Sequence, residues 1–419
     1  MDGTHTEAWT MENRNMRPKS GEAPFHLDEI FFSRTDKRGT IQAWNSVFER
    51  VADFPPERLQ GAPHRIIRHE NMPKGVFWLM WEALKSGQRF GGYVCNKASD
   101  GLFYWVYAIV TPTEDGYTSV RIKPTSPLLA KVTALYAEAL AAEREEGLTP
   151  EASGHRILKA LAAEGFPTYA AFASASIAAE VAARDAGLGR GADPRLGHFR
   201  EMREIVQAIV AEQKILLSQM YAMRLVPVNM RIMAARIERQ GGAVSAISDN
   251  YRLLSSEVAD QLAAFVEDGM PTSTFQFRAM ERALFLTSAC RIMAEADAYF
   301  CTHDDTENSE NLALEAARLS AVMSQTRIEA DEALRTASAR AIRRESQAIS
   351  LGRAILPLDS IRIMCRVENE RLRILEGGLA AVVASLDIFH TQMAKNLEEI
   401  LALTHRLKDH AEVVQALRG

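Results

Sequence analysis

The pattern of hydrophobic and polar positions changes once along the chain, near residue 125. Before that point, short β-prone runs alternate with turns that contain Gly, Asp or Ser. IFFSRT and TIQAW flank a turn at 36–39, which predicts a hairpin. FGGYVCNKA, LFYWVYAIV and YTSVRIKPT are separated by turns at 99–101 and 114–116, which predicts a three-stranded antiparallel meander. Short helices, including one over 76–85, are expected between the two groups of strands.

After Pro124 the strand pattern ends and helical patterns follow. Residues 128–146 are rich in Ala, Leu, Glu and Lys, which favours a helix. Thr149 followed by Pro150 is typical of the start of the next helix. Residues 157–183 predict two short helices with a break near 165–167.

Three glycines and a proline within 188–194 predict a linker, and almost everything beyond 195 is expected to be helical. Breaks are expected where glycine or proline interrupts the pattern, at Pro227, 241–242, 269–271 and Pro357.

Two segments of the helical region keep the alternating three-four spacing of a heptad seam. The first contains Val244, Ile247, Tyr251, Leu254 and Val258. The second contains Leu379, Val382, Leu386, Phe389, Met393, Asn396, Ile400, Leu403 and Leu407. Two packing arrangements fit these seams: a bundle within one chain, or a dimeric coiled coil.

Composition places the chain among globular proteins. It has 419 residues, 47% hydrophobic and 25% charged, with a net charge of −5. That charge gives no footprint for nucleic acid or for an anionic membrane surface. Apolar stretches are far shorter than a membrane-spanning helix requires, and the first residues lack the apolar core of a signal peptide. We therefore expect a cytoplasmic protein without a membrane span.

The segment before residue 125 also carries candidate chemistry. Its order of two strands, short helices and three strands resembles a PAS domain, in which a pocket lies between the sheet and the helices. Aromatic residues could cover a planar ring, and Asn45, Arg68, His69 and Asn71 could bind its polar groups. The planar guanidinium of Arg68 suits a pyrophosphate because it can bind phosphate oxygens in a bidentate way. Taken alone, an Arg-His pair in a turn also fits two solvated surface residues.

A longer ordered pattern gives a closer resemblance. Residues 60–73 read Q-G-x-P-H-x-x-x-R-H-x-x-M-P, followed by M-W-x-x-L-K-x-G and D-G-x-x-Y-W-V. From residue 41 to residue 125 the chain resembles the PAS domain of the aerotaxis receptor family. The resemblance implies an FAD-binding sensor, with cofactor-binding roles for Asn45, Arg68, His69 and Trp81. Glu70 and Asn71 stand where that family usually has Pro and Asp.

Haem is the alternative cofactor, because some related PAS domains bind it through an axial histidine. His64 and His69 are the histidines of this segment. An empty pocket also fits the sequence.

The stretch from 225 to 258 resembles the cytoplasmic hairpin of methyl-accepting chemotaxis proteins. Asn229, the Ala-Ala-Arg run at 234–236, the glycines at 241–242 and the Glu-Val pair at 257–258 follow the order of that motif. The Gln-Thr-Asn tip that docks the coupling protein and the histidine kinase is missing, and Pro227 stands near its place. The resemblance is thus to a degenerate form of the hairpin.

Together these features predict an α+β chain, in which a PAS domain with a five-stranded antiparallel sheet is followed by a helical bundle or coiled coil. The expected domains are a disordered segment at 1–24, a PAS sensor at 25–125, a helical connector at 126–194 and a signalling region at 195–419. No catalytic or metal-binding motif is recognised.

The favoured function is non-enzymatic redox or oxygen sensing, passed to chemotaxis partners such as the coupling protein or the histidine kinase by a homodimer. The alternatives are a haem-based oxygen sensor, and a scaffold or dimerisation protein that does not sense.

Overall fold

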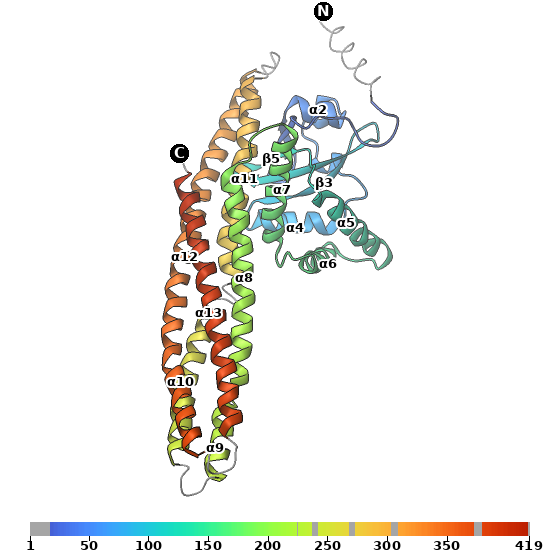
Figure 1. Cartoon of the computed structure of the whole chain (residues 1–419). Coiled ribbons are helices and arrows are strands. Elements are labelled where there is room, and N and C mark those ends of the chain that lie inside the picture. Colours follow the sequence, from blue (N-terminus) through green and yellow to red (C-terminus); the bar gives the residue numbers. More distant parts are fainter. Residues whose placement is uncertain are drawn as a thin grey trace, which may run out of the picture. The chain divides into compact units, whose positions relative to one another are not determined.

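A computed structural model of the chain describes residues 17–223, 225–236, 242–267, 273–302, 309–372 and 379–417. Two compact units are present. The first contains Met1–Leu196 and Glu281–Glu332, and the second contains Gly197–Met280 and Ala333–Gly419. An N-terminal antiparallel sheet followed by long helices confirms the predicted α+β class (Figure 1). The domain limits expected from the sequence stay a prediction.

The sheet of the first unit has five antiparallel strands in the order β2-β1-β5-β4-β3. Its strands are β1 (Ile30–Asp36), β2 (Ile41–Trp44), β3 (Phe90–Lys97), β4 (Phe103–Pro112) and β5 (Gly116–Ile122). The predicted hairpin and meander are both confirmed. The sheet is completed by pairing of β1 with β5, a contact between residues far apart in the sequence.

Alternation along the strands gives the sheet two different faces. The register places Ser33, Tyr104, Ser119 and Arg121 on one face, which we call the inner face. Four short helices join β2 to β3. They are α2 (Ser46–Ala52), α3 (Pro56–Leu59), the 3-10 helix η1 (His64–Ile67) and α4 (Lys74–Lys85). Phe48 of α2, Leu59 of α3 and Ile67 of η1 share one apolar core with Phe31 and Tyr104 of the inner face.

The opposite, outer face is covered by helices from later in the chain. The connector consists of α5 (Leu128–Glu145), α6 (Pro150–Ala163) and α7 (Tyr169–Gly187), and α7 lies beside the sheet (Figure 1). The Tyr107 hydroxyl donates to the carbonyl of Ala173, 3.0 Å away. The break between α6 and α7 falls where the sequence predicted it.

Parts of two further helices, α11 (Ser273–Thr302) and α12 (Ser309–Leu372), also pack on the outer face. The rings of Phe32 and Phe300 meet edge to face with centroids 5.0 Å apart. Arg34 binds Glu315 of α12 with three nitrogen–oxygen contacts of 2.7 to 3.0 Å. The sheet therefore has a face toward its own short helices and a face toward the long helices of the same unit.

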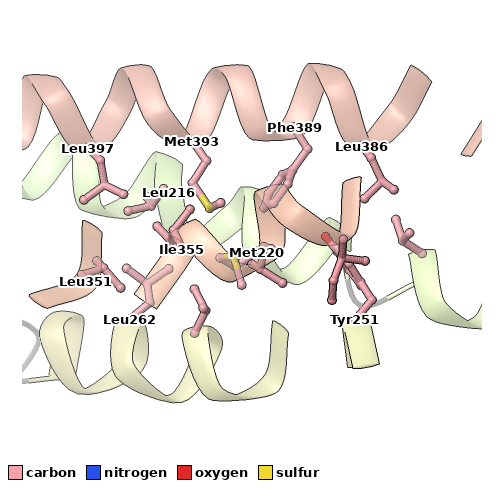
Figure 2. Packing of buried hydrophobic residues seen from close by; sticks show 14 of the residues in the cluster. Leu216, Met220, Tyr251, Leu262, Leu351, Ile355, Leu386, Phe389, Met393 and Leu397 are labelled. Atoms are coloured by element: carbon pink, nitrogen blue, oxygen red, sulfur yellow. The ribbon is translucent and has the colours of Figure 1, made fainter. Parts of the chain in front are cut away.

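The second unit is built from long helices. It contains most of α8 (Pro194–Met223), α9 (Val226–Arg236), α10 (Gly242–Glu267) and α13 (Leu379–Ala416), with the remaining part of α12. Figure 2 shows Tyr251 and Leu262 of α10, Ile355 of α12, and Phe389 and Met393 of α13 in one core. Residues of both predicted heptad seams thus pack within one chain, which is the first of the two arrangements left open by the sequence.

The expected proline breaks have different outcomes. Pro227 is the second residue of α9, where a missing N–H leaves no helical bond unmade. Pro357 lies inside α12, which continues on both sides, so a break there was a wrong prediction. A proline inside a helix costs about 3 kcal/mol, and the neighbouring Ile355 and Leu358 of α12 are buried in the core and hold the helix in place. Residues 241 and 269–271 lie outside the described part of the chain, whereas Gly242 begins α10.

Candidate functional site

The inner face carries a cluster of polar side chains inside an otherwise apolar core. Ser119 and Arg121 come from β5 and Ser33 from the paired strand β1, while His64 approaches from the start of η1. Strand alternation explains why Ser119 and Arg121 lie on the same side. We call these residues, together with Tyr104 and Asn96, the inner polar cluster.

Arg121 lies at the centre of this cluster and is only 4% exposed. Its Nη2 donates to Ser33 Oγ at 3.0 Å and to His64 Nε2 at 2.7 Å. Its Nη1 has no hydrogen-bond partner, and none of its described hydrogen bonds goes to a carboxylate. The cluster therefore holds a buried positive charge and no described anion.

His64 is neutral in this arrangement. A guanidinium can only donate hydrogen bonds, so Nε2 must accept and the ring proton must lie on Nδ1. Burial and the positive charge of Arg121 both hold the pKa of His64 well below its ordinary value. Burial also lowers the pKa of Arg121, to about 10, which leaves the guanidinium charged at neutral pH.

Three more polar atoms of the cluster have no hydrogen-bond partner: Tyr104 Oη, Ser119 Oγ and Asn96 Nδ2. Tyr104 stacks on Phe31 with ring centroids 5.6 Å apart and an interplanar angle of 7°. Buried polar groups are usually paired, and each of these groups can donate a hydrogen bond. An acceptor-rich ligand or buried water on this face would satisfy them.

Arg68 and His69, predicted as ligand-binding residues, follow η1 at the edge of this region. The Arg68 guanidinium lies 3.7 Å from the centroid of the Phe77 ring of α4. Burial lowers the pKa of Arg68, and Glu143 opposes that effect. An isolated bridge pairs Arg68 with Asn96 of β3, so the predicted pair lies next to one member of the inner polar cluster.

The His69 ring meets Phe103 edge to face, and its Nδ1 accepts a hydrogen bond from the backbone N–H of Asn71 at 3.1 Å. Burial lowers the pKa of His69, which favours the neutral ring. Asn71 itself is exposed, and its Oδ1 is 3.4 Å from Arg144 of α5.

Trp81 of α4 packs edge to face on Tyr117, which the register of β5 assigns to the inner face. Its ring also lies 3.6 Å from the position that a Cβ on Gly39 would take.

Asn45 has a structural role. Its Oδ1 caps α2 by accepting from Phe48 N, and also accepts from Phe32 N, while Nδ2 donates to the carbonyl of Ile30. Arg68, His69 and Asn71 are thus brought together, and Asn45 and Trp81 lie elsewhere. Their proposed roles in binding a ligand stay predictions.

No sequence motif points to Arg121 or Ser119. Tyr104 is one of the aromatic residues expected to cover a planar ring, and His64 is expected only as a possible axial ligand of haem. The available signal was the alternation in β5, where Tyr117, Ser119 and Arg121 share one phase. Polar residues in one phase of a strand usually indicate a solvated face, and only the helices over this face reverse that expectation.

Comparisons with known proteins agree with the fold of the sheet and its short helices. Residues 41–122 match the family model described as the PAS fold. The aerotaxis receptor of Escherichia coli (strain K12) is 37% identical over 118 residues, which is 27% of this chain and 23% of the receptor. The chain thus matches less than a quarter of that relative's length. Within the described residues, no helix is long and apolar enough to cross a bilayer, and no cluster of His, Cys, Asp or Glu is arranged to hold a metal.

Proposed function

We propose that this protein is a non-enzymatic redox sensor whose PAS domain binds FAD. The observation that carries the proposal is the inner polar cluster, four side chains with unpaired buried nitrogen or oxygen atoms in the domain that is similar to an aerotaxis receptor. When bound, FAD supplies a ring that takes electrons from a reduced carrier and returns them to an oxidant. The chain's task is to hold that ring and to respond to its charge.

The residues present fit such a group. Arg121 and Tyr104 offer unpaired donors toward ring nitrogens and carbonyl oxygens, while Phe48 and Phe31 offer apolar ring surface. Arg68 would bind the pyrophosphate, with His69 and Asn71 beside it at the same edge. Trp81 would cover the ring from α4, and Asn45 would act by fixing the start of α2.

FAD is favoured over haem by the contacts of the two histidines. Haem iron needs a free imidazole nitrogen facing the pocket. His64 Nε2 is already an acceptor for Arg121 at 2.7 Å, and His69 Nδ1 accepts from Asn71 N. If His64 bound haem iron through Nε2, the buried guanidinium of Arg121 would lose one of its two hydrogen-bond partners.

The signal would leave through the outer face. Phe32 contacts Phe300 of α11, and Arg34 and Arg89 bind Glu315 and Glu329 of α12. A ligand state can bias a partner only if it binds two conformations with different affinity. A difference of about 1–3 kcal/mol is typical of such coupling. Strand β1 carries Ser33 toward the inner polar cluster and Phe32 and Arg34 toward the helices, and so connects the two.

A homodimer acting on chemotaxis partners in the cytoplasm, such as the coupling protein or the histidine kinase, completes the proposal. In the second unit, Leu253 of α10 and Leu356 and Met364 of α12 line a groove and are 59%, 66% and 53% exposed. Exposed apolar side chains of this kind fit an interface between proteins. Light scattering should give twice the chain mass, and Leu356→Glu should shift it toward the monomer. A monomeric wild type would remove the dimer from the proposal.

The absorption spectrum of the purified full chain, before and after addition of FAD, tests the sensor. Flavin bands near ~450 nm are expected, and a Soret band near ~410 nm would indicate haem instead. Arg68→Ala should lose most of the bound flavin, whereas Arg58→Ala, an exposed arginine of α3, should keep it. A preparation that stays colourless in every case would favour the scaffold or dimerisation function.

A further inference from the structure

Arg121 is a buried cation that the chain's described contacts leave without an anion. Two neutral acceptors, Ser33 Oγ and His64 Nε2, share its Nη2, and Nη1 has no partner. Taking a charge out of water is unfavourable unless it is paired and hydrogen-bonded. The fold keeps it inside nevertheless, beneath Phe48, whose ring centroid is 5.5 Å from the guanidinium carbon.

The unpaired atoms of the inner face can all donate hydrogen bonds, but only those of Arg121 and Tyr104 are close enough to share one ligand edge: Tyr104 stacks on Phe31, which pairs with Arg121. Asn96 pairs with Tyr104 and Ser119 with Val110, so these two side chains are roughly 20 Å apart along the sheet. Nη1 of Arg121 and Nδ2 of Asn96 can only donate, and the hydroxyls of Tyr104 and Ser119 can donate as well. The register of β3, β4 and β5 puts all four side chains on the inner face. No described hydrogen bond brings a carboxylate to Arg121.

We propose that Arg121 and Tyr104 of the inner polar cluster bind the electron-rich pyrimidine edge of the FAD ring, and that Arg121 is the fixed counter-cation for the negative charge which the ring carries when reduced. This inference rests on the proposed function and adds which redox state of the ring the site binds more tightly. The site holds the reduced ring more tightly than the oxidised ring, because only the reduced ring brings an anion to Nη1. Electrostatic preference of this kind raises the reduction potential of a bound group.

The direct test is a reductive titration of the FAD-loaded full chain with dithionite as electron donor and a reference dye. Arg121→Met removes the charge and keeps an apolar side chain of similar length. The ratio of affinities for reduced and oxidised ring should fall at least tenfold, which lowers the potential by about 59 mV for a one-electron couple. Arg121→Lys, which keeps the charge, should restore most of the shift. Arg38→Met, an exposed arginine in the turn after β1, is the matched control.

A second variant guards against a folding defect in Arg121→Met. Tyr104→Phe keeps the ring that stacks on Phe31 and removes only an unpaired buried hydroxyl. The unloaded protein should be as stable as the wild type or more stable, because an unsatisfied polar group is lost. Its affinity for FAD should nevertheless fall severalfold.

Thr111→Val is the control for Tyr104→Phe. It also removes an unpaired buried hydroxyl, but the pairing of Thr111 with Thr118 places it on the outer face. It should leave FAD affinity unchanged. If the inner polar cluster merely holds internal water, the two variants will behave alike and Arg121→Met will keep the wild-type potential, which overturns this inference while leaving the sensor intact. If the wild type takes up no flavin, the proposed function itself fails, and this inference with it.

Discussion

Glu180 of α7 and Tyr93 of β3 form a buried hydrogen bond across the outer face of the sheet, with the phenol oxygen 2.7 Å from Oε1. The same carboxylate accepts from Ser126 Oγ and from the backbone N–H groups of Thr125 and Ser126. The Glu180 side chain therefore connects the sheet and the residues just before α5 to the middle of α7.

Glu180→Ala should destabilise the first unit strongly, because it leaves two backbone donors and two hydroxyls without their acceptor. Each buried donor left unsatisfied costs about 1–3 kcal/mol, so the loss should exceed that of any single-donor variant. Tyr93→Phe, which removes one donor, should cost about 1.5 kcal/mol. Urea unfolding followed by tryptophan fluorescence measures both, since four of the five tryptophans lie between residues 44 and 105. Equal losses for the two variants would contradict a network centred on Glu180.

Acid sensitivity should arise from His64. In the folded chain, burial and the charge of Arg121 hold the pKa of His64 below its ordinary value. Below about pH 6.5 the unfolded chain therefore binds a proton on this ring and the folded chain does not. Stability should therefore fall as the pH falls below that value, by at most about 1.4 kcal/mol per pH unit for this group. His64→Asn keeps an acceptor for Arg121 and cannot titrate, so its unfolding free energy should vary less between pH 7 and pH 5. Parallel pH curves for the two proteins would refute this source.

Glu329 should make the unfolding free energy depend on pH in a more acidic range than His64 does. Burial raises the pKa of its carboxyl, but hydrogen bonds and charge from Arg89, with a further bond from Arg282, outweigh that effect and lower the pKa to about 2. The stabilisation is present above the ordinary pKa near 4.5 and is lost as the pH falls toward 2. Glu329→Gln should be less stable than the wild type at pH 7, and the difference should shrink between pH 4 and pH 2. A constant difference across that range would argue against the ion pair.

Substitution of two helical glycines should have opposite effects, because Gly75 of α4 is closely packed against α6 and Gly352 of α12 has open space around it. A Cβ on Gly75 would lie 2.5 Å from the backbone nitrogen of Gly154, so Gly75→Ala should cost about 1–3 kcal/mol through overpacking. A Cβ on Gly352 of α12 meets nothing within 4 Å, so Gly352→Ala should add about 0.5–1 kcal/mol. Tryptophan fluorescence reports the first change and circular dichroism the second. A tolerated Gly75→Ala would show that α4 and α6 can separate without loss.

Local patterns were sufficient to predict the strands, their turns and the breaks in the connector. The predicted turns at 36–39, 99–101 and 114–116 each contain a glycine. In the first two turns, Gly39 and Gly101 have positive φ values of 78° and 92°, which fit tight turns. Packing partners far along the chain could not be predicted in this way. Nothing in the sequence around Glu315 or Glu329 indicates that these residues of α12 bind Arg34 of β1 and Arg89, the residue before β3.

The candidate site shows the same limit. A motif led to Arg68 and His69, whereas Arg121 resembles any strand residue until the helices over its face are known. Pro357 shows the converse, since a local rule predicted a break and packing on both sides overrode it.

The alternation of β5 has a consequence for how this domain can vary. Val120 and Ile122 lie on one face and Arg121 on the other, with a single backbone between them. Substitutions can therefore tune either side separately, but loss or gain of one residue before Arg121 would turn the guanidinium toward the long helices and an aliphatic side chain toward the inner face. Related chains should differ more freely at Val120 and Ile122 than at Arg121, and hardly at all in the length of this strand.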